Sequence, residues 1–373
     1  MQTAEIITLR CKKKTIMFTK LTKKLDSFLE MGVPFYDCIV MKDGVCVYRH
    51  ANGFTDNKNK VAVTGKEKYN IYSCSKLITC VAALQLWEKG LFSLDDKLSD
   101  YMPEFSQMTV CKGKEIVPAK NPILIKHLFT MTAGFSYWLE SPQIIKCREE
   151  TNGECQTREL MKYLAKEPLL FEPGKRWVYS LCHDVLAALV EVISGIQFGE
   201  YVKNNIFTPL GMNNSTFLLD DKDLREIVNQ YAYDVNKGVF ERDKHIPYKF
   251  GSKFESGGAG CISTVEDYIK FIEALRVGDI ILKKETIDLL STNQLSQEQM
   301  QTYWVADYGY GLGQRCPKDD KKSDFGWGGA AGAWYAIDRK NQITVYLGTH
   351  ILGYADYQNT RSQILPIIQE ILK

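Results

Sequence analysis

The most restrictive feature of this 373-residue sequence is that strand patterns lie near both ends, whereas helical patterns occupy the middle. Residues 36–50, YDCIVMKDGVCVYRH, form two β-rich runs around Asp43-Gly44, a pair typical of a two-residue hairpin turn. Residues 331–352 form a second pair of runs around turn residues 338–341. Because strands need partners, we expect both ends to share one sheet around a helical insertion, with a binding groove between the two parts.

Helical spacing of apolar residues marks both ends of the domain. It predicts one helix from Met17 onward and a C-terminal helix that holds Pro366 near its first turn. Residues 1–16 show no periodic pattern and are expected to be a disordered extension. The sequence therefore predicts one domain over 17–373, with an α/β part at about 17–72 and 300–373 and a helical part at about 73–299.

Three segments of the middle region have clear helical patterns. These are residues 76–89, 184–194 and 264–276, the last behind a predicted capping box at Ser263-Thr-Val-Glu266. The first segment carries apolar side chains on almost every face, so we expect this helix to be buried on all sides. Its first residue, Lys76, would then be a buried lysine, and we expect burial to lower its pKa toward that of a usable base.

Charge and cysteine content exclude several classes of function. With 47 basic and 45 acidic residues the net charge is +2, which offers no attraction for nucleic acid or for an anionic membrane. No apolar run approaches the roughly 18 residues of a membrane span, and the N-terminus lacks a signal-peptide pattern. The eleven cysteines are scattered and never form C-x-x-C, which favours free thiols and a cytoplasmic location. No cysteine or histidine spacing predicts a metal site.

The stretch IYSCSKLITC, residues 71–80, places Ser73 three residues before Lys76 at the head of an apolar run. If Ser73 opens the helix, Lys76 lies one turn further on the same side, close enough to contact the hydroxyl. The positive end of the helix would also favour negative charge at an attacked carbonyl. The alternative is that Ser73 only caps the helix and Lys76 is a solvated lysine.

Two further stretches are typical of a ligand site. In EPGKRWVYSL, Tyr179 and Ser180 follow a Pro-Gly break and precede a helix, although a tyrosine there could be an ordinary half-exposed aromatic. The stretch DFGWGGAAGAWYAID, residues 324–338, places four glycines ahead of a strand, which allows close approach of a ligand to the backbone. No G-x-S-x-G elbow occurs, so an α/β-hydrolase with a Ser-His-Asp triad is disfavoured.

IYSCSK, WVYSL and FGWGGAAGAWYAID, in this order, resemble the three motifs of the penicillin-recognising serine hydrolases. The sequence is closest in these motifs to class C β-lactamases and β-lactamase-like carboxylesterases. Supporting stretches follow the same order: LWEKGLFSLDDKLSDYMPEF, HLFTMTAGFSY, PLGMNNSTF, GGAGCISTVEDYIKF and DYGYGLG. The resemblance covers about residues 17–373. It implies an α+β, β-lactamase/transpeptidase-like fold, in which an antiparallel sheet from both termini is flanked by helices and interrupted by an all-helical domain.

The resemblance also implies the roles of individual residues. Ser73 would be the acylated nucleophile, Lys76 would assist its deprotonation, and Tyr179 would carry a proton to the leaving group. The backbone N–H groups of Ser73 and Ala330 would form the oxyanion hole. Whether Lys76 or Tyr179 is the base stays open, because a coupled pair need not have separate assignments.

Two departures from the family's motifs bear on the substrate. Relatives that act on β-lactams or D-Ala-D-Ala peptides usually have Lys or His at the start of the third motif, where this chain has Trp327. Losing that cation removes a charge-assisted hydrogen bond worth about 1.5 to 3 kcal/mol. Leu181 replaces the asparagine that many β-lactamases use to contact the substrate amide. We expect Trp327, Gly328, Gly329 and Leu181 to border the substrate, although Trp327 could equally serve only to pack the groove wall.

The resulting expectation is a cofactor-free serine hydrolase that forms an acyl-enzyme at Ser73 and acts on small or medium carboxylic esters. The alternatives of the same fold are a D-amino-acid peptide or amide hydrolase, a weak β-lactamase and an acyltransferase. An alternative of another class is a non-catalytic ligand-binding protein. The expected partner is a small-molecule ester or amide, with neither nucleic acid nor a membrane, and the sequence leaves the oligomeric state open.

Overall fold

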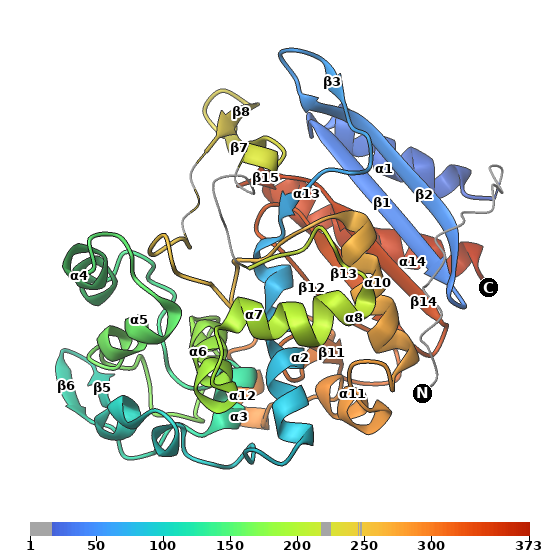
Figure 1. Cartoon of the computed structure of the whole chain (residues 1–373). Helices are drawn as coiled ribbons and strands as arrows, with labels where there is room; N and C mark the ends of the chain where they lie inside the picture. The colour runs from blue at the N-terminus through green and yellow to red at the C-terminus, as the bar shows by residue number, and fades with distance from the viewer. Residues whose placement is uncertain (1–16, 218–224, 245, 247) are drawn as a thin grey trace.

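The computed structural model describes residues 17–217, 225–244, 246 and 248–373. The extension expected at 1–16 lies outside the described residues. The described chain is built around an eight-stranded sheet with antiparallel neighbours, in which strands from the two ends of the chain lie side by side (Figure 1). The strands are, in spatial order, β10 (Tyr308–Tyr310), β11 (Arg315–Pro317), β12 (Asp324–Gly328), β13 (Trp334–Asp338), β14 (Ile343–Gly348), β1 (Phe35–Lys42), β2 (Val45–Asp56) and β3 (Val61–Ala62).

Both predicted hairpins are present. Asp43 and Gly44 connect β1 to β2 with φ angles of 52° and 76°, the left-handed values that a two-residue hairpin turn requires. The second hairpin joins β13 to β14, and Asn341 stabilises its turn by donating from its side-chain amide to Asp338 at 2.7 Å. β1 pairs with β14, so the first and last hairpins form the centre of one sheet, as the sequence predicts.

Helices from distant parts of the chain cover both faces of this sheet. On one face lies α1 (Thr19–Glu30), packed against α14 (Ile364–Ile371), and Tyr36 of β1 donates to Asp26 on this side at 2.5 Å. On the other face lies α10 (Val265–Val277), where Tyr268 stacks on Tyr346 of β14. Because neighbouring residues of a strand face opposite sides, this double cover explains why seven of the eight residues of β1 are buried.

In the sequence, a helical part lies between the N-terminal and the C-terminal strands of the sheet. Figure 1 shows this part, which includes α4, α5 and α6, beside the sheet. Its main helices, together with the neighbouring short elements, are η1 (Tyr72–Cys74), α2 (Ser75–Glu88), η2 (Leu98–Asp100), η3 (Pro103–Gln107), α3 (Ile125–Phe129), α4 (Pro142–Glu150), α5 (Thr157–Leu164), α6 (Cys182–Ser194), α7 (Phe198–Val202), η4 (Lys203–Phe207) and α8 (Thr208–Leu210). Further described helices are α11 (Lys284–Leu290), α12 (Gln297–Met300), α13 (Ala355–Thr360) and η5 (Arg361–Gln363).

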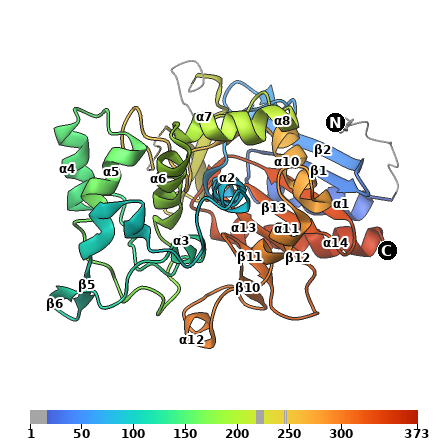
Figure 2. The same cartoon turned by 60° about the horizontal axis from the view of Figure 1, so that its bottom comes forward.

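Helix α2 runs through the centre of the molecule and packs against α6, and Figure 2 shows it nearly end-on and surrounded. Eleven of its fourteen residues are buried, which confirms the prediction of a helix enclosed on all sides. Such a helix cannot form without the segments around it, because nearly all of its surface is apolar. It therefore joins the helical part to the sheet.

Several local features differ from the sequence prediction. The middle region also contains short strands: β4 (Tyr69–Asn70) pairs with β9 (Ile262–Ser263), β5 (Thr109–Lys112) with β6 (Glu115–Pro118), and β7 (Gln230–Asp234) with both β8 (Val239–Asp243) and β15 (Ile351–Leu352). Helix α10 falls within 73–299 yet packs on the sheet. Its cap is Thr264, which accepts from the N–H of Asp267 at 3.0 Å, so the box predicted at Ser263-Glu266 is wrong by one residue. Ser263 instead belongs to β9.

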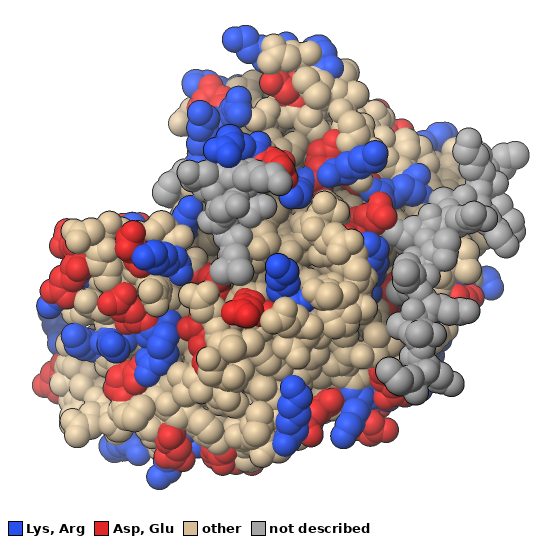
Figure 3. All heavy atoms as spheres, viewed as in Figure 1, with Lys and Arg blue, Asp and Glu red and all other residues tan. Residues whose placement is uncertain are grey.

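The surface has no dominant sign of charge on the face that Figure 3 shows, where basic and acidic side chains are interspersed. Among the described residues, no single helix has the length and hydropathy needed to cross a bilayer. The helices Cys182–Ser194 and Phe198–Leu210 reach that length and hydropathy only when they are counted together, and they are bent by 77° relative to each other.

Candidate active site

Ser73 lies in the short 3₁₀ turn η1, directly before the buried helix α2. The helix begins at Ser75, and no side chain caps it, so the interpretation of Ser73 as a helix cap is wrong. The preceding residue, Tyr72, has a φ of 49°, a left-handed conformation that costs energy for a residue with a side chain. Its phenol donates to Gln230 at 2.6 Å, which helps to hold the strained turn. Backbone strain thus occurs next to the predicted nucleophile.

The structure brings Ser73, Lys76 and Tyr179 together, as the three motifs predict. Tyr179 donates to the Ser73 hydroxyl with an oxygen-to-oxygen distance of 2.6 Å. Lys76 donates to the same oxygen at 3.3 Å, and its Nζ lies 4.6 Å from the centre of the Tyr179 ring. Ser73 is 7% exposed and Tyr179 is half-buried, so the nucleophile has limited contact with solvent.

Lys76 is completely buried and is held by a glycine-rich segment of the inserted region. Its ammonium donates to the carbonyl of Gly258 at 2.7 Å. The N–H of Gly258 in turn donates to the buried carboxylate of Asp184 at 3.2 Å, and Ser256 donates to the same oxygen at 2.6 Å. A Cβ on Gly258 would lie only 2.6 Å from the other Asp184 oxygen, so glycine is needed for this close approach.

The electrostatic surroundings of Lys76 differ from the sequence prediction. Burial acts to lower its pKa, but the phenols of Tyr137 and Tyr179 and the carboxylate of Asp184 outweigh burial and leave the pKa above its usual value. The expectation that burial would lower the pKa of Lys76 is therefore wrong. A protonated Lys76 places a positive charge beside the oxygen of Ser73 and the ring of Tyr179.

The third motif ends β12 beside the nucleophile turn. A Cβ on Gly329 would collide with the carbonyl oxygen of Ile71, and one on Gly328 would collide with the guanidinium of Arg361. Arg361 donates to the carbonyl of Gly329 at 3.2 Å and so fixes this backbone. Ala330 follows as an exposed residue, and within the described chain its N–H donates to no protein acceptor. The proposed oxyanion contacts of Ser73 and Ala330 stay predictions.

Trp327 forms part of the wall behind Tyr179. The two rings stack with centroids 5.8 Å apart, and the indole N–H donates to the Tyr179 oxygen at 3.4 Å. Trp327 is 9% exposed, so packing accounts for most of its surface. Leu181 is buried where α6 begins, and no described contact joins it to Ser73 or Tyr179. Substrate contacts of Trp327, Gly328, Gly329 and Leu181 stay predictions.

The sequence analysis did not identify Asp184, Gly258 or Tyr137 as site residues. The Tyr137 ring lies 5.2 Å from that of Tyr179 and 5.5 Å from the Lys76 ammonium. Burial raises the pKa of Tyr137 to about 12, with the lysine acting in the opposite direction. Tyr137 and Gly258 lie within stretches that resemble the family, but only the fold shows that they contact the motifs.

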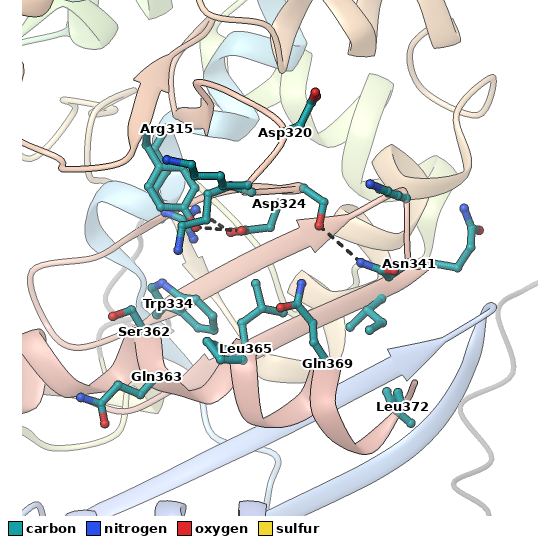
Figure 4. Close-up of a pocket in the computed structure, with 18 of the residues that line it drawn as sticks. Arg315, Asp320, Asp324, Trp334, Asn341, Ser362, Gln363, Leu365, Gln369 and Leu372 are labelled. Carbon is teal, nitrogen blue, oxygen red and sulfur yellow. Dashed lines mark hydrogen bonds and ion pairs between the residues drawn. The ribbon is translucent and has the colours of Figure 1, made fainter.

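A large cavity elsewhere in the molecule does not belong to this site. It has a volume of about 1060 Å³ and lies between α14 and the neighbouring strands of the sheet, as Figure 4 shows. The buried ion pair of Arg315 and Asp324, with an N-to-O distance of 2.5 Å, and the indole of Trp334 line it. The described residues that line this cavity do not include Ser73, Lys76 or Tyr179. Across the described residues, no cluster of three or more His, Cys, Asp or Glu side chains could hold a metal.

Curated relatives include both hydrolases and acyltransferases. The sequence is 30% identical over 307 residues to lovastatin esterase of Penicillium rubens, an alignment that covers 73% of this chain and 76% of that protein. It is 28% identical over 303 residues to monacolin J acid methylbutanoyltransferase of Aspergillus terreus, with 76% and 72% of the two chains covered.

Solved structures share the fold over nearly the whole chain. Simvastatin synthase from Aspergillus terreus superposes with a TM-score of 0.79 at 21% identity, covering 94% of this chain and 98% of that chain. A hydrolase with promiscuous acyltransferase activity superposes with a TM-score of 0.78 at 22% identity, covering 95% and 98%. The model of the Beta-lactamase family matches residues 32–365. The three ordered motifs, their convergence on Ser73 and this match over most of the chain together assign the protein to the β-lactamase family.

Proposed function

We propose that this protein is a serine hydrolase that forms an acyl-enzyme at Ser73 and hydrolyses small or medium carboxylic esters. The observation that carries the proposal is the contact of Ser73 with two side chains that can exchange protons with it, the phenol of Tyr179 at 2.6 Å and the amine of Lys76 at 3.3 Å. A hydroxyl becomes a good nucleophile only when a neighbouring group takes its proton, and proton transfer requires such a distance.

In the proposed acylation step, Tyr179 first releases to water the phenolic proton that it donates to Ser73 in the structure. The phenolate takes the Ser73 proton while the serine oxygen attacks the ester carbonyl, and Lys76 remains protonated beside both oxygens. The tetrahedral oxyanion then collapses, the bond to the alcohol oxygen breaks, and Tyr179 returns the proton to the departing alkoxide. The products are a neutral alcohol, an acylated Ser73 and a regenerated phenolate.

Deacylation repeats the same proton movements with water. The phenolate of Tyr179 takes one proton from the attacking water, the bond between the acyl carbon and Ser73 breaks, and the proton passes to the serine oxygen. The net reaction is ester plus water giving carboxylic acid plus alcohol. No cofactor is needed, since every proton that leaves one group is received by another.

Ester substrates are favoured by the apolar wall beside the nucleophile. Trp327 stands where relatives that bind carboxylate-bearing substrates place a cation, and it packs on Tyr179. A substrate carboxylate placed there would lose its hydration without gaining a charged partner. An uncharged ester avoids this cost, and the relationship to lovastatin esterase supports the same class of reaction.

An acyltransferase is the second candidate, favoured by the 28% identity to monacolin J acid methylbutanoyltransferase. In that reaction an alcohol takes the place of water in the second step. Amide hydrolysis, weak β-lactamase activity and non-catalytic ligand binding are further alternatives. We also propose a cytoplasmic location, which the free thiol state of every described cysteine supports.

The proposal is tested by incubating the purified protein and its Ser73→Ala variant with a fluorophosphonate, a p-nitrophenyl ester series and a chromogenic cephalosporin. We expect one adduct by mass on the unmodified protein, ester turnover, and slow or no cephalosporin turnover. The Ser73→Ala variant should lose both adduct and turnover while keeping its melting temperature.

Adding a primary alcohol to the ester reaction separates hydrolysis from acyl transfer. A new ester as the main product would assign an acyltransferase, whereas free acid as the main product supports the hydrolase. Absence of adduct and of turnover on every substrate would refute the hydrolase and favour the ligand-binding alternative.

A further inference from the structure

Trp304 is an exposed tryptophan that contacts the proposed catalytic tyrosine. Its side chain is 61% exposed, yet its ring centre lies 5.8 Å from that of Tyr179 in an edge-on arrangement. A second edge-on contact, at 4.6 Å, joins it to the buried ring of Trp177. An isolated exposed apolar residue needs no explanation, but this one borders the group that touches Ser73.

The segment that carries Trp304 is anchored to the loop of the second motif. The Thr302 hydroxyl accepts a hydrogen bond from the backbone N–H of Trp177 at 2.9 Å. Gln299 donates to the carbonyl of Gly174 at 2.7 Å, and Tyr303 packs edge-on against Trp177 at 4.9 Å. Buried neighbours therefore fix the position of Trp304, while one side of its ring remains in solvent. A fixed and exposed aromatic surface is suited to contact a ligand, because little entropy is lost when the ligand packs on it.

The position of Trp304 selects one part of the substrate. In the proposed acylation, Tyr179 gives its proton to the departing alcohol oxygen, so this oxygen must lie beside the tyrosine. The alcohol portion of the ester then extends toward the rings next to Tyr179. Of the four rings that contact Tyr179, Trp177 is 1% exposed, Trp327 is 9% exposed and Tyr137 is half-buried, which leaves Trp304 as the one exposed ring among them.

We infer that Trp304 is a specificity-determining residue that packs against an aromatic or other planar apolar alcohol portion of the ester. This inference rests on the proposed function and adds the chemical class of the leaving group. Stacking of the alcohol on the indole favours esters of aromatic alcohols over those of small aliphatic alcohols.

Two acetates with similarly basic leaving groups test the inference: benzyl acetate, which has an aromatic alcohol, and ethyl acetate, which does not. We expect Trp304→Ala to lower the ratio of the two kcat/KM values, benzyl over ethyl, by about five- to tenfold. Trp304→Phe should retain most of the ratio. A uniform loss on both esters, or an unchanged ratio, would overturn the inference.

Trp138 offers a matched control, because it is also a largely exposed tryptophan, at 59%, and has no described ring contact with Tyr179. Trp138→Ala should leave the benzyl-to-ethyl ratio unchanged. Melting temperatures of all variants identify any loss of activity that arises from unfolding. A ratio that falls equally in Trp138→Ala and Trp304→Ala would overturn the assignment to Trp304.

A binding measurement keeps the inference separate from the proposed function. Calorimetric titration of benzyl acetate into Ser73→Ala, with and without Trp304→Ala, requires no turnover. We expect the second substitution to raise the dissociation constant at least about fivefold. If the unmodified protein hydrolyses neither acetate and forms no fluorophosphonate adduct, the proposed function fails while this titration still decides the inference. Equal dissociation constants would overturn it.

Discussion

At the scale of single residues, the site combines one hydroxyl, one phenol and one buried ammonium. Lys76 stays protonated because Tyr137, Tyr179 and Asp184 outweigh the effect of burial on its pKa. Its carbonyl partner, Gly258, is fixed by Asp184, so the cation has a set position below the nucleophile. The protonation of Lys76 thus depends on residues from several segments of the chain and not only on the Ser-x-x-Lys spacing.

Substituting Tyr179→Phe removes the only phenol oxygen that the structure describes within hydrogen-bond distance of Ser73. We expect kcat/KM for a p-nitrophenyl ester to fall about 100- to 10,000-fold, because the proton can no longer be transferred. The ring contacts with Trp327 and Tyr137 remain, so the melting temperature should change little. Steady-state kinetics and thermal unfolding check both expectations.

Tyr310→Phe is the matched control for that experiment. Tyr310 packs edge-on against Trp327 at 5.6 Å, and its buried hydroxyl has no hydrogen-bond partner among the described residues. Removing this hydroxyl should leave both activity and stability close to those of the unmodified protein. A loss below about tenfold in Tyr179→Phe, or an equal loss in Tyr310→Phe, would contradict the role given to Tyr179.

Glu255 predicts a dependence of stability on pH. Burial raises the pKa of this carboxyl to about 7, and the carboxylates of Glu191 and Glu200 act in the same direction, against the N–H of Gly199. Because the folded protein holds the Glu255 proton more tightly than the unfolded chain does, this group contributes stability at low pH. The contribution is fully present below the pKa of the unfolded chain and is lost as pH rises through about 7. Glu255→Gln should therefore match the unmodified protein near pH 4 and exceed it by about 3 kcal/mol at pH 8.

Urea unfolding of both proteins at the two pH values measures this difference, and comparing them cancels the titration of all other groups. Glutamine keeps an oxygen that can accept from Gly199, so the hydrogen bond at 2.6 Å need not be lost. A difference in the free energy of unfolding that is independent of pH would show that Glu255 does not titrate between these values.

At the scale of secondary-structure elements, the site depends on the end of β12 lying directly against η1. Glycine at position 329 permits the close approach to the carbonyl of Ile71, and Arg361 holds the same backbone from the other side. The elements come from opposite ends of the sequence, so their contact positions the third motif beside Ser73.

Gly329→Ala should separate these two elements. Its Cβ would meet backbone and not a flexible side chain, so we expect the free energy of unfolding to fall by about 1 to 3 kcal/mol and ester turnover to fall with it. The neighbouring Ala330→Ser, at an exposed position, should preserve both because an oxyanion contact would use its backbone N–H. Unchanged turnover in Gly329→Ala would show that the close approach is not needed for activity.

At the scale of the whole molecule, the helical part and the sheet share elements and are not two separable units. Helix α2 packs against α6 of the helical part, while η1 before it contacts β12 of the sheet. Strands from both ends of the chain lie together between α10 and the pair formed by α1 and α14. Loss of any one layer therefore exposes apolar surface of another.

We expect the protein to unfold in one cooperative transition. Far-UV circular dichroism, tryptophan fluorescence and calorimetry should give the same midpoint, because a solvent-exposed α2 would be unstable. Two separate calorimetric transitions, or fluorescence that changes at a lower temperature than the helical signal, would show that the inserted part unfolds independently.

Much of the architecture follows from the sequence by itself. The Asp43-Gly44 turn, the β-rich runs near both ends and the apolar helix after Ser73 each predict a local structure that is present, because a turn or a buried helix is encoded by adjacent residues. The order of the three motifs likewise predicts that Ser73, Lys76 and Tyr179 meet, through resemblance to a known family.

Only the tertiary structure decides how these groups are charged and what surrounds them. The pKa of Lys76 is raised and not lowered, since Tyr137 and Asp184 approach it from segments far away in the sequence. Trp304 likewise gains its place beside Tyr179 only through folding. Electrostatic and packing energies depend on distances in space, and adjacent residues in a sequence do not fix those distances.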